Sequence, residues 1–225
     1  MKISVRGILF DMDGVLVSSI GSVERSWTKW AEAHGVDPTL AIQTAHGRRA
    51  IESVRFLRPD LDARQEMLKV EEMEVEDNEG LEVLPGVQQI LHVLPANRWA
   101  VVTSATQRLA LSRLQHGGIP TPQRLVTADM VSKGKPDPEA YLTGARLLGL
   151  APQDCLVIED AASGAKAGHA AGCKVLATLF SHPLESLSAA DWVVRSLDDV
   201  RVTISGDTIE VEFEEVAVPD AGKNA

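Results

Sequence analysis

Residues 8–14 read Ile-Leu-Phe-Asp-Met-Asp-Gly, three apolar residues followed by two carboxylates that stand two positions apart. A short apolar run that ends at polar residues is typical of a buried strand in a parallel sheet. The glycine after Asp13 lets the backbone turn and approach a ligand closely. An aspartate at a strand end also commonly caps a helix or a turn, so this stretch needs support from the rest of the chain.

The same pattern recurs along the chain. Apolar runs at 100–102, 125–126 and 156–158 end at Thr103, Thr127 and Glu159. Helical stretches lie between the runs, at 86–94, 107–115, 138–148 and 163–171. Alternating strands and helices predict an α/β fold with a doubly wound, Rossmann-like parallel sheet. Ligands bind such sheets at the carboxyl ends of the strands, which is where these polar residues fall.

The segment 17–84 differs because its apolar residues follow a helical period, as at Trp27, Trp30 and Ala31. We therefore expect an α-helical cap at 17–84, inserted into a core made of residues 1–16 and 85–225. Within the cap, the acidic stretch 71–82 is expected to form a solvated helix face.

The carboxyl-terminal part carries a second β signal. Apolar and polar residues alternate on both sides of Gly206-Asp207, which predicts a β-hairpin with a type II′ turn that extends or covers a sheet edge. Residues 217–225 are expected to form a loose tail.

The composition excludes several classes of protein. A net charge of −10 without any basic run argues against nucleic acid and against anionic membranes as partners. The amino-terminal apolar stretches are too short for a secretory signal or a membrane span, so we expect a cytoplasmic protein. Cys155 and Cys173 form no CxxC pair and are expected to be reduced thiols of the core.

The acidic residues at two strand ends suggest a metal site. Glu159 and Asp160 end one apolar run, and in a parallel sheet they lie on the same edge as Asp11 and Asp13. Such a cluster of carboxylates is repulsive unless a hard dication such as Mg²⁺ neutralises it. The alternative is that Glu159 and Asp160 merely begin the next helix.

Two further segments suit a phosphate. Thr103-Ser104-Ala105 offers a hydroxyl and consecutive backbone N–H groups to an oxyanion, although helix capping has the same appearance. Lys135 stands in a loop that two prolines stiffen, which would hold an ammonium group in place. Without the acidic residues, an ordinary surface lysine would be the simpler interpretation.

Taken in order, these segments resemble the four motifs of the haloacid dehalogenase superfamily: Asp11-x-Asp13-Gly14, Thr103-Ser104, Lys135-Pro136 and Glu159-Asp160. The resemblance covers essentially the whole chain, and the helical insertion looks like the small α-helical cap of that superfamily. Residues 46–49, 99–104 and 134–139 look like those of the glycerol-3-phosphatase and 2-deoxyglucose-6-phosphatase branch.

The resemblance implies a phosphatase that acts on a small phosphorylated metabolite, a sugar or polyol phosphate. Asp11 is the expected nucleophile, which forms an aspartyl-phosphate, and Asp13 is the expected acid and base. Mg²⁺ is expected on the Asp11 carboxylate, the Asp13 main-chain carbonyl and Asp160. Glu159 is then either a further ligand or an acceptor that orients Lys135 or a water.

The expected substrate contacts lie in the core and in the cap. Phosphate is expected to contact Gly14, Thr103, Ser104, Ala105 and Lys135. Specificity is expected to reside in the cap, which encloses the rest of the substrate. Arg49 is the main candidate there, followed by His46 and Arg48, and the alternative is that these residues lie on the surface or pair with the acidic helix.

Other functions share parts of this pattern. A phosphomutase of the β-phosphoglucomutase type shares all four motifs, but the resemblance to it implies a histidine ten residues after the second aspartate, where this chain has Val23. A phosphoglycolate phosphatase also stays open, as does a binding protein that has lost catalysis, although the full set of motifs argues against the latter. We expect a monomer or a weak homodimer.

Overall fold

The computed structural model describes residues 1–216 and is built around a six-stranded parallel sheet. The strand order is β6-β5-β2-β7-β8-β9, and every neighbouring pair is parallel. The strands are β2 (Gly7–Phe10), β5 (Trp99–Val102), β6 (Leu125–Val126), β7 (Cys155–Glu159), β8 (Lys174–Thr178) and β9 (Trp192–Val194). The four predicted strands are confirmed, whereas β8 and β9 were not predicted.

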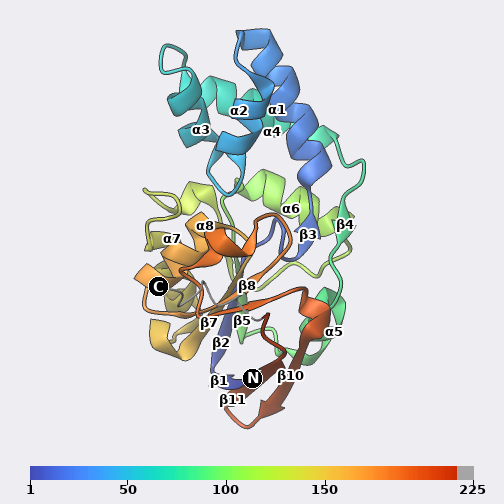
Figure 1. Ribbon diagram of the computed structural model, residues 1–225, viewed down its shortest axis with the longest axis vertical. Helices are drawn as coiled ribbons and strands as arrows, with labels where there is room; N and C mark the ends of the chain where they lie inside the picture. Colours follow the sequence, from blue (N-terminus) through green and yellow to red (C-terminus); the bar gives the residue numbers. More distant parts are fainter. Residues whose placement is uncertain (217–225) are drawn as a thin grey trace, which may run out of the picture.

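Helices cover both faces of this sheet (Figure 1). They are α5 (Val87–Val93), α6 (Gln107–His116), α7 (Glu139–Leu148) and α8 (Ala162–Ala170). Successive residues of β2 point to opposite faces, so Phe10 packs in a cluster with α5 and α6, while Leu9 packs in another with α7 and α8. The predicted doubly wound α/β fold is confirmed.

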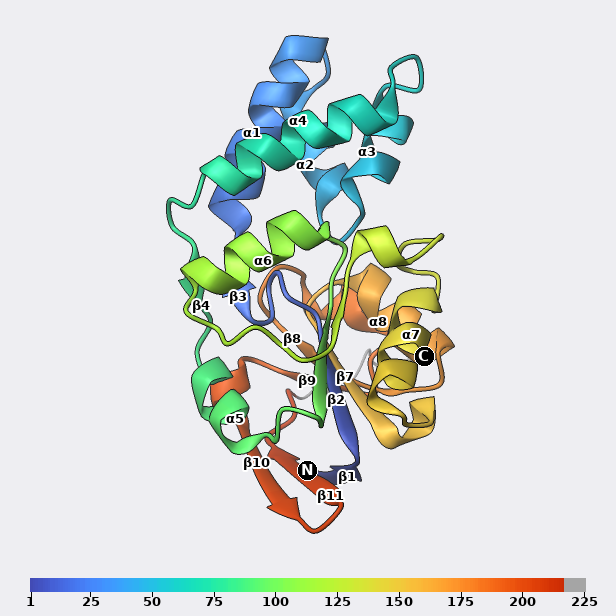
Figure 2. The same ribbon diagram turned by 180° about the vertical axis from the view of Figure 1, so that it is seen from behind.

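Four further helices lie beyond the carboxyl ends of the strands (Figures 1 and 2). They are α1 (Ile20–His34), α2 (Pro38–Ala45), α3 (Ala50–Leu57) and α4 (Ala63–Glu76). A buried cluster that includes Trp27, Trp30 and Val70 holds them together. The antiparallel pair β3 (Val17–Ser18) and β4 (Glu82–Val83) leads into and out of this group. We call α1–α4 the cap; the domain limits at 17 and 84 stay a prediction.

The expectation of a solvated acidic face at 71–82 is wrong for part of that stretch. Helix α4 ends at Glu76, and the side chains of Glu71 and Glu74 are buried. Long-range partners explain the burial of Glu74, because it accepts hydrogen bonds from the Trp27 indole (3.1 Å) and from the Arg113 guanidinium (2.6 Å). Composition alone does not reveal such partners, since they lie 47 and 39 residues away.

The predicted hairpin is confirmed as β10 (Val200–Ser205) and β11 (Thr208–Phe213), joined at Gly206 with φ +57°. It extends no edge of the parallel sheet. Instead, β11 also pairs with β1 (Lys2–Val5), which gives a separate three-stranded antiparallel sheet. This sheet lies at the end of the molecule opposite the cap (Figure 1). The predicted tail at 217–225 lies outside the described residues.

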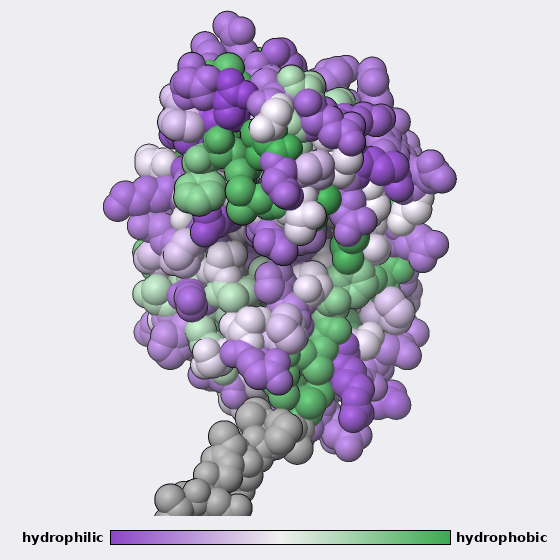
Figure 3. All heavy atoms as spheres, turned by 45° about the horizontal axis from the view of Figure 1, so that its top comes forward, coloured by the Kyte–Doolittle hydropathy of each residue, from purple (hydrophilic) through white to green (hydrophobic). Residues whose placement is uncertain are grey.

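Short 3-10 turns complete the chain: η1 (Ala128–Met130), η2 (Pro152–Asp154), η3 (Leu184–Leu187) and η4 (Leu197–Asp199). Seen with the cap brought forward, the surface is mostly hydrophilic, with smaller hydrophobic areas between the polar side chains (Figure 3). Over residues 1–216, none of the helices combines the length and the apolar character that crossing a bilayer requires.

Candidate active site

The candidate residues meet at the carboxyl edge of the sheet because β5 and β7 flank β2. Asp11 follows β2, Thr103 follows β5, and β7 ends at Glu159, directly before Asp160. Lys135 reaches the same place from the loop between η1 and α7.

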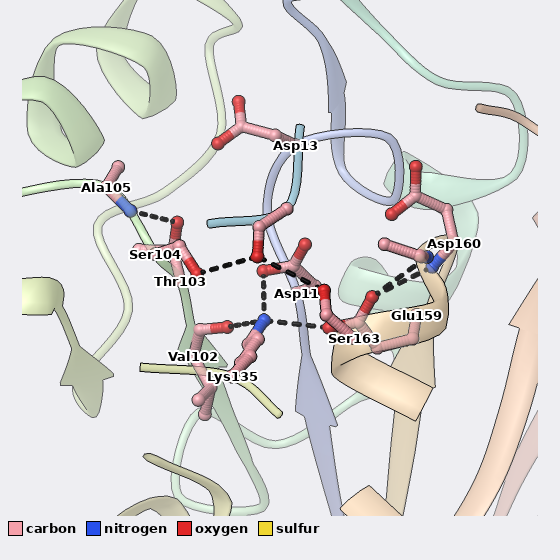
Figure 4. A network of polar contacts seen from close by, with 12 residues as sticks. Asp11, Asp13, Val102, Thr103, Ser104, Ala105, Lys135, Glu159, Asp160 and Ser163 are labelled. Carbon is pink, nitrogen blue, oxygen red and sulfur yellow. Dashed lines mark hydrogen bonds and ion pairs between the residues drawn. The ribbon is translucent and has the colours of Figure 1, made fainter. Parts of the chain in front are cut away.

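Lys135 lies at the centre of the cluster and is 5% exposed (Figure 4). Its ammonium group donates to Asp11 Oδ1 (2.7 Å), to Glu159 Oε1 (2.7 Å) and to the Val102 carbonyl (3.1 Å). Burial by itself lowers the pKa of Lys135, but the carboxylates of Asp11 and Glu159 more than offset this, so the pKa is raised above its ordinary value. The side chain is therefore a fixed cation with all three N–H donors in use.

Both oxygens of Glu159 are occupied by donors of the protein. Oε1 accepts from Lys135 and from the Tyr141 hydroxyl (2.6 Å), and Oε2 accepts from the backbone N–H groups of Asp160 (3.1 Å) and Ala161 (3.2 Å). Of the two roles expected for Glu159, this geometry favours orienting Lys135 over binding a metal. Tyr141 is a contributor that the sequence did not reveal.

Three buried acids form a group that can hold a cation. Ligand oxygens of Asp11, Glu159 and Asp160 lie within 4.8 Å of one another. Burial raises the pKa of Asp11 to about 7; Lys135 lowers this pKa in part, and Glu159 and Asp13 raise it. Burial, followed by Glu159 and Asp11, also raises the pKa of Asp160 well above its ordinary value. The charge of Lys135 therefore offsets only part of the cost of burying these carboxylates.

The donor set fits a hard divalent cation. With Glu159 occupied, Asp11 and Asp160 are the acids of this group that keep oxygens to offer, and oxygen is the donor that such cations prefer. Gly14 leaves the space beside the Asp160 carboxylate free, because a Cβ at this residue would stand 1.8 Å from Asp160 Oδ2. Its φ of +81° is also a conformation that side chains other than glycine rarely adopt.

The predicted phosphate-binding loop makes internal contacts. The Ala105 N–H donates to Thr103 Oγ1 (3.0 Å), which closes the turn after β5. The Ser104 hydroxyl donates to the Gly47 carbonyl of the cap (3.4 Å), and Ser163 on α8 donates to the same oxygen (3.2 Å; Figure 4). The structure thus brings Thr103, Ser104 and Ala105 next to Asp11, while their role in phosphate binding stays a prediction.

Asp13 lies on the side of Asp11 that faces away from Lys135 (Figure 4). Its Oδ1 accepts from the Ser19 hydroxyl (2.7 Å) and from Arg113 (2.8 Å). Arg113 is 3% exposed, and sequence reasoning missed it. The available signal was its position on α6, four residues after Leu109 on the stripe that packs against the core.

The cap residues expected to contact substrate have different environments. The guanidinium group of Arg49 donates to Glu52 and to the carbonyls of Val131 (2.9 Å) and Ser132 (2.9 Å), so it ties the cap to the loop that leads to Lys135. His46 has a buried Nε2 without a partner among residues 1–216, and burial, followed by nearby His182, lowers the pKa of its ring. Arg48 is exposed.

A cavity of about 390 Å³ separates the cap from the acidic cluster. Asp11, Asp13 and Thr103 line it from the core, and Arg49, His46 and Glu74 line it from the cap. The volume lies within the range of ~300–1,000 Å³ that is typical of sites for small molecules. The arrangement therefore places the carboxylate of Asp11, a fixed cation and a candidate metal site at one wall of this cavity.

Comparisons with known proteins agree with this geometry. Hexitol phosphatase A of Escherichia coli (strain K12) is 42% identical over 203 residues, which cover 88% of this chain and 94% of that protein. Glycerol-1-phosphate phosphohydrolase 2 of Saccharomyces cerevisiae is 33% identical over 95% of this chain and 91% of its own length. These relatives confirm the predicted resemblance to the sugar and polyol phosphatase branch.

The fold also has solved relatives. A β-phosphoglucomutase of Clostridium difficile superposes with a TM-score of 0.74 over 86% of this chain and 92% of that chain; its 23% identity supports the fold alone. The family model described as haloacid dehalogenase-like hydrolase matches residues 5–172. The chain therefore belongs to the haloacid dehalogenase-like hydrolases.

Proposed function

We propose that this protein is a Mg²⁺-dependent phosphomonoester hydrolase that acts on a small sugar or polyol phosphate through an aspartyl-phosphate on Asp11. The observation that carries the proposal is the position of Asp11. Its carboxylate lies in the wall of the cavity, is held at 2.7 Å by Lys135, and lies in one cluster with Asp160.

Each step of this reaction uses a group of the chain. An Asp11 carboxylate oxygen forms a bond to phosphorus as the bond from phosphorus to the substrate oxygen breaks, and Asp13 gives that oxygen its proton. Water then attacks phosphorus, Asp13 takes the proton of that water, and inorganic phosphate leaves with Asp11 restored. Lys135 and Thr103 are proposed to hold the phosphoryl oxygens throughout, as positioned charge and dipole.

A Mg²⁺ ion on Asp11, Asp160 and the Asp13 carbonyl would offset negative charge on the phosphoryl group and on the nucleophile. The raised pKa values of Asp11 and Asp160 support a bound cation, because a neighbouring positive charge keeps a buried carboxylate ionised.

The proposed substrate class rests on the relatives and on the cavity. One relative is named a hexitol phosphatase and the other a glycerol-1-phosphate phosphohydrolase, so both names refer to a phosphorylated polyol. The cavity wall contributed by the cap carries polar groups for hydroxyls, including His46 and Arg48. A phosphomutase is less well supported, since Val23 lines the cavity at the position where the mutase resemblance requires a histidine.

The cellular setting is proposed from the cysteines. Cys155 and Cys173 are buried and unpaired, which suits the reducing cytoplasm.

The experiment is phosphate release from glycerol 3-phosphate, a hexitol phosphate, 2-deoxyglucose 6-phosphate, β-glucose 1-phosphate and phosphoglycolate, with Mg²⁺ or with EDTA. Asp11→Asn is compared with Asp60→Asn, because Asp60 is an exposed cap aspartate that pairs with Arg58. We expect Mg²⁺-dependent release from a polyol or sugar phosphate that disappears in Asp11→Asn and persists in Asp60→Asn. Activity in EDTA or in Asp11→Asn would contradict the mechanism, and isomerisation of β-glucose 1-phosphate without release would identify a mutase.

A further inference from the structure

Arg113 bridges the proposed acid and base of the core to an acid of the cap. From α6, its Nη1 donates to Asp13 Oδ1 (2.8 Å) and its Nη2 donates to Glu74 Oε2 (2.6 Å). Glu74 lies on α4, and its second oxygen accepts from the Trp27 indole of α1 (3.1 Å). Figure 2 shows α4 lying over α6, so this chain of contacts spans the boundary between cap and core.

Most of the side chains in this bridge are buried. Arg113, Glu74 and Trp27 are each less than 10% exposed. The guanidinium group of Arg113 is held between two carboxylates, and removing it would leave the buried carboxylate of Glu74 without its cation. Glu74 thus contacts one end of the guanidinium group from the cap, while the other end contacts Asp13.

The contacts also distinguish the two oxygens of Asp13. Ser19 and Arg113 both donate to Oδ1, and among residues 1–216 the structure gives no partner to Oδ2. The carboxylate is thus held by one oxygen, while the other is left for proton exchange. Asp13 lines the cavity on the side of Asp11 away from Lys135, so its free oxygen is open to a molecule bound in the cavity.

We propose that Arg113 is a positioning residue that orients Asp13 for proton transfer, and that Glu74 holds Arg113 in place when the cap lies over the cavity. This inference rests on the proposed phosphatase function. It assigns to the cap helix α4 a part in the chemistry, because closing the cap supplies the acid that fixes Arg113. The step it serves is donation of the Asp13 proton to the alkoxide oxygen while the bond from that oxygen to phosphorus breaks and Asp11 bonds to phosphorus.

The test compares two substrates whose leaving groups differ in their need for a proton. Release of a sugar or polyol alkoxide needs a proton, whereas 4-nitrophenolate leaves without one. Arg113→Ala and Glu74→Gln are compared with Arg108→Ala. Arg108 is the matched control, because it also lies on α6 and pairs with α4 acids, Glu71 and Glu72, but it is half exposed and is not bonded to Asp13.

We expect Arg113→Ala to lower kcat for the best alkyl phosphate by about 10- to 100-fold, and to change KM and the pre-steady-state burst of 4-nitrophenol by less than about threefold. Glu74→Gln is expected to show the same split with a smaller loss, and it carries the test if Arg113→Ala does not fold. Arg108→Ala is expected to stay within about twofold of the wild type on both substrates.

Two results would overturn the inference while leaving the phosphatase intact. One is equal loss of the alkyl rate and the aryl burst, which indicates general damage to the site. The other is wild-type kcat in both Arg113→Ala and Glu74→Gln. A wild-type protein that hydrolyses neither substrate with Mg²⁺ would instead refute the proposed function, and the inference with it.

Discussion

Replacing Lys135 with methionine isolates the electrostatic role of the central cation. Methionine keeps most of the apolar stem and removes the charge, so little of the effect comes from lost packing. The ammonium group is bonded at 2.7 Å to both Asp11 and Glu159 and is almost fully buried. Removing one partner of a buried ion pair costs about 3–5 kcal/mol, and we expect Lys135→Met to lose that much stability at pH 8 in EDTA.

The loss should depend on pH in a defined direction. The pKa of Asp11 is already raised to about 7 by burial, and Lys135 is the main group that lowers it. In Lys135→Met this pKa rises further. A carboxyl whose folded-state pKa is raised stabilises the fold below its unfolded pKa, and that stability is lost as the pH rises through the folded pKa. The difference in free energy of unfolding between the variant and the wild type is therefore expected to be smaller at pH 6 than at pH 8.

The measurement is urea unfolding followed by circular dichroism at both pH values. A second variant, Lys135→Met with Asp11→Asn, removes one of the carboxylates left without its cation. We expect the double variant to recover about 1–3 kcal/mol relative to Lys135→Met, as for charges in direct contact. A loss below about 1 kcal/mol, or a loss equal at pH 6 and pH 8, would refute the electrostatic account of Lys135.

Three other predictions follow from the geometry. Gly14→Ala is expected to abolish phosphate release and Mg²⁺-dependent thermal stabilisation, because its Cβ would collide with Asp160; wild-type metal affinity by calorimetry would contradict this. Mg²⁺ at 100 times its Kd is expected to stabilise the wild type by about 2.7 kcal/mol in urea unfolding and to leave Asp160→Asn nearly unchanged. Phe213→Ala is expected to cost about 3–5 kcal/mol in urea unfolding, because Phe213 is buried against Trp192. Its KM should stay at the wild-type value, since the hairpin lies opposite the cap, and a raised KM would count against that separation.

The strands of the sheet could be predicted from the sequence where the pattern that marks each strand lies within a few consecutive residues. The run 8–10 shows its apolar character and its acidic end within seven residues, and so does the run that ends at Glu159. Parallel topology then places such ends on one edge, which is why Asp11, Glu159 and Asp160 meet as the sequence leads one to expect. Strand β9 escaped prediction because its run at 192–194 is not directly followed by an acidic or hydroxyl residue of the kind that marked the predicted strands.

The sequence did not reveal which charged residues pair across long separations along the chain. Arg113 looks like any arginine in a helix, and Glu74 looks like one of many acids in 71–82. Only the packing of α4 over α6 reveals that these two are buried together and that Arg113 also holds Asp13. Likewise, only the fold shows that Arg49 is bonded to Glu52 and to two backbone carbonyls. Local pattern determines strands and their reactive ends, because both depend on neighbours in the chain, whereas the burial and partner of a charge depend on residues that folding alone brings near.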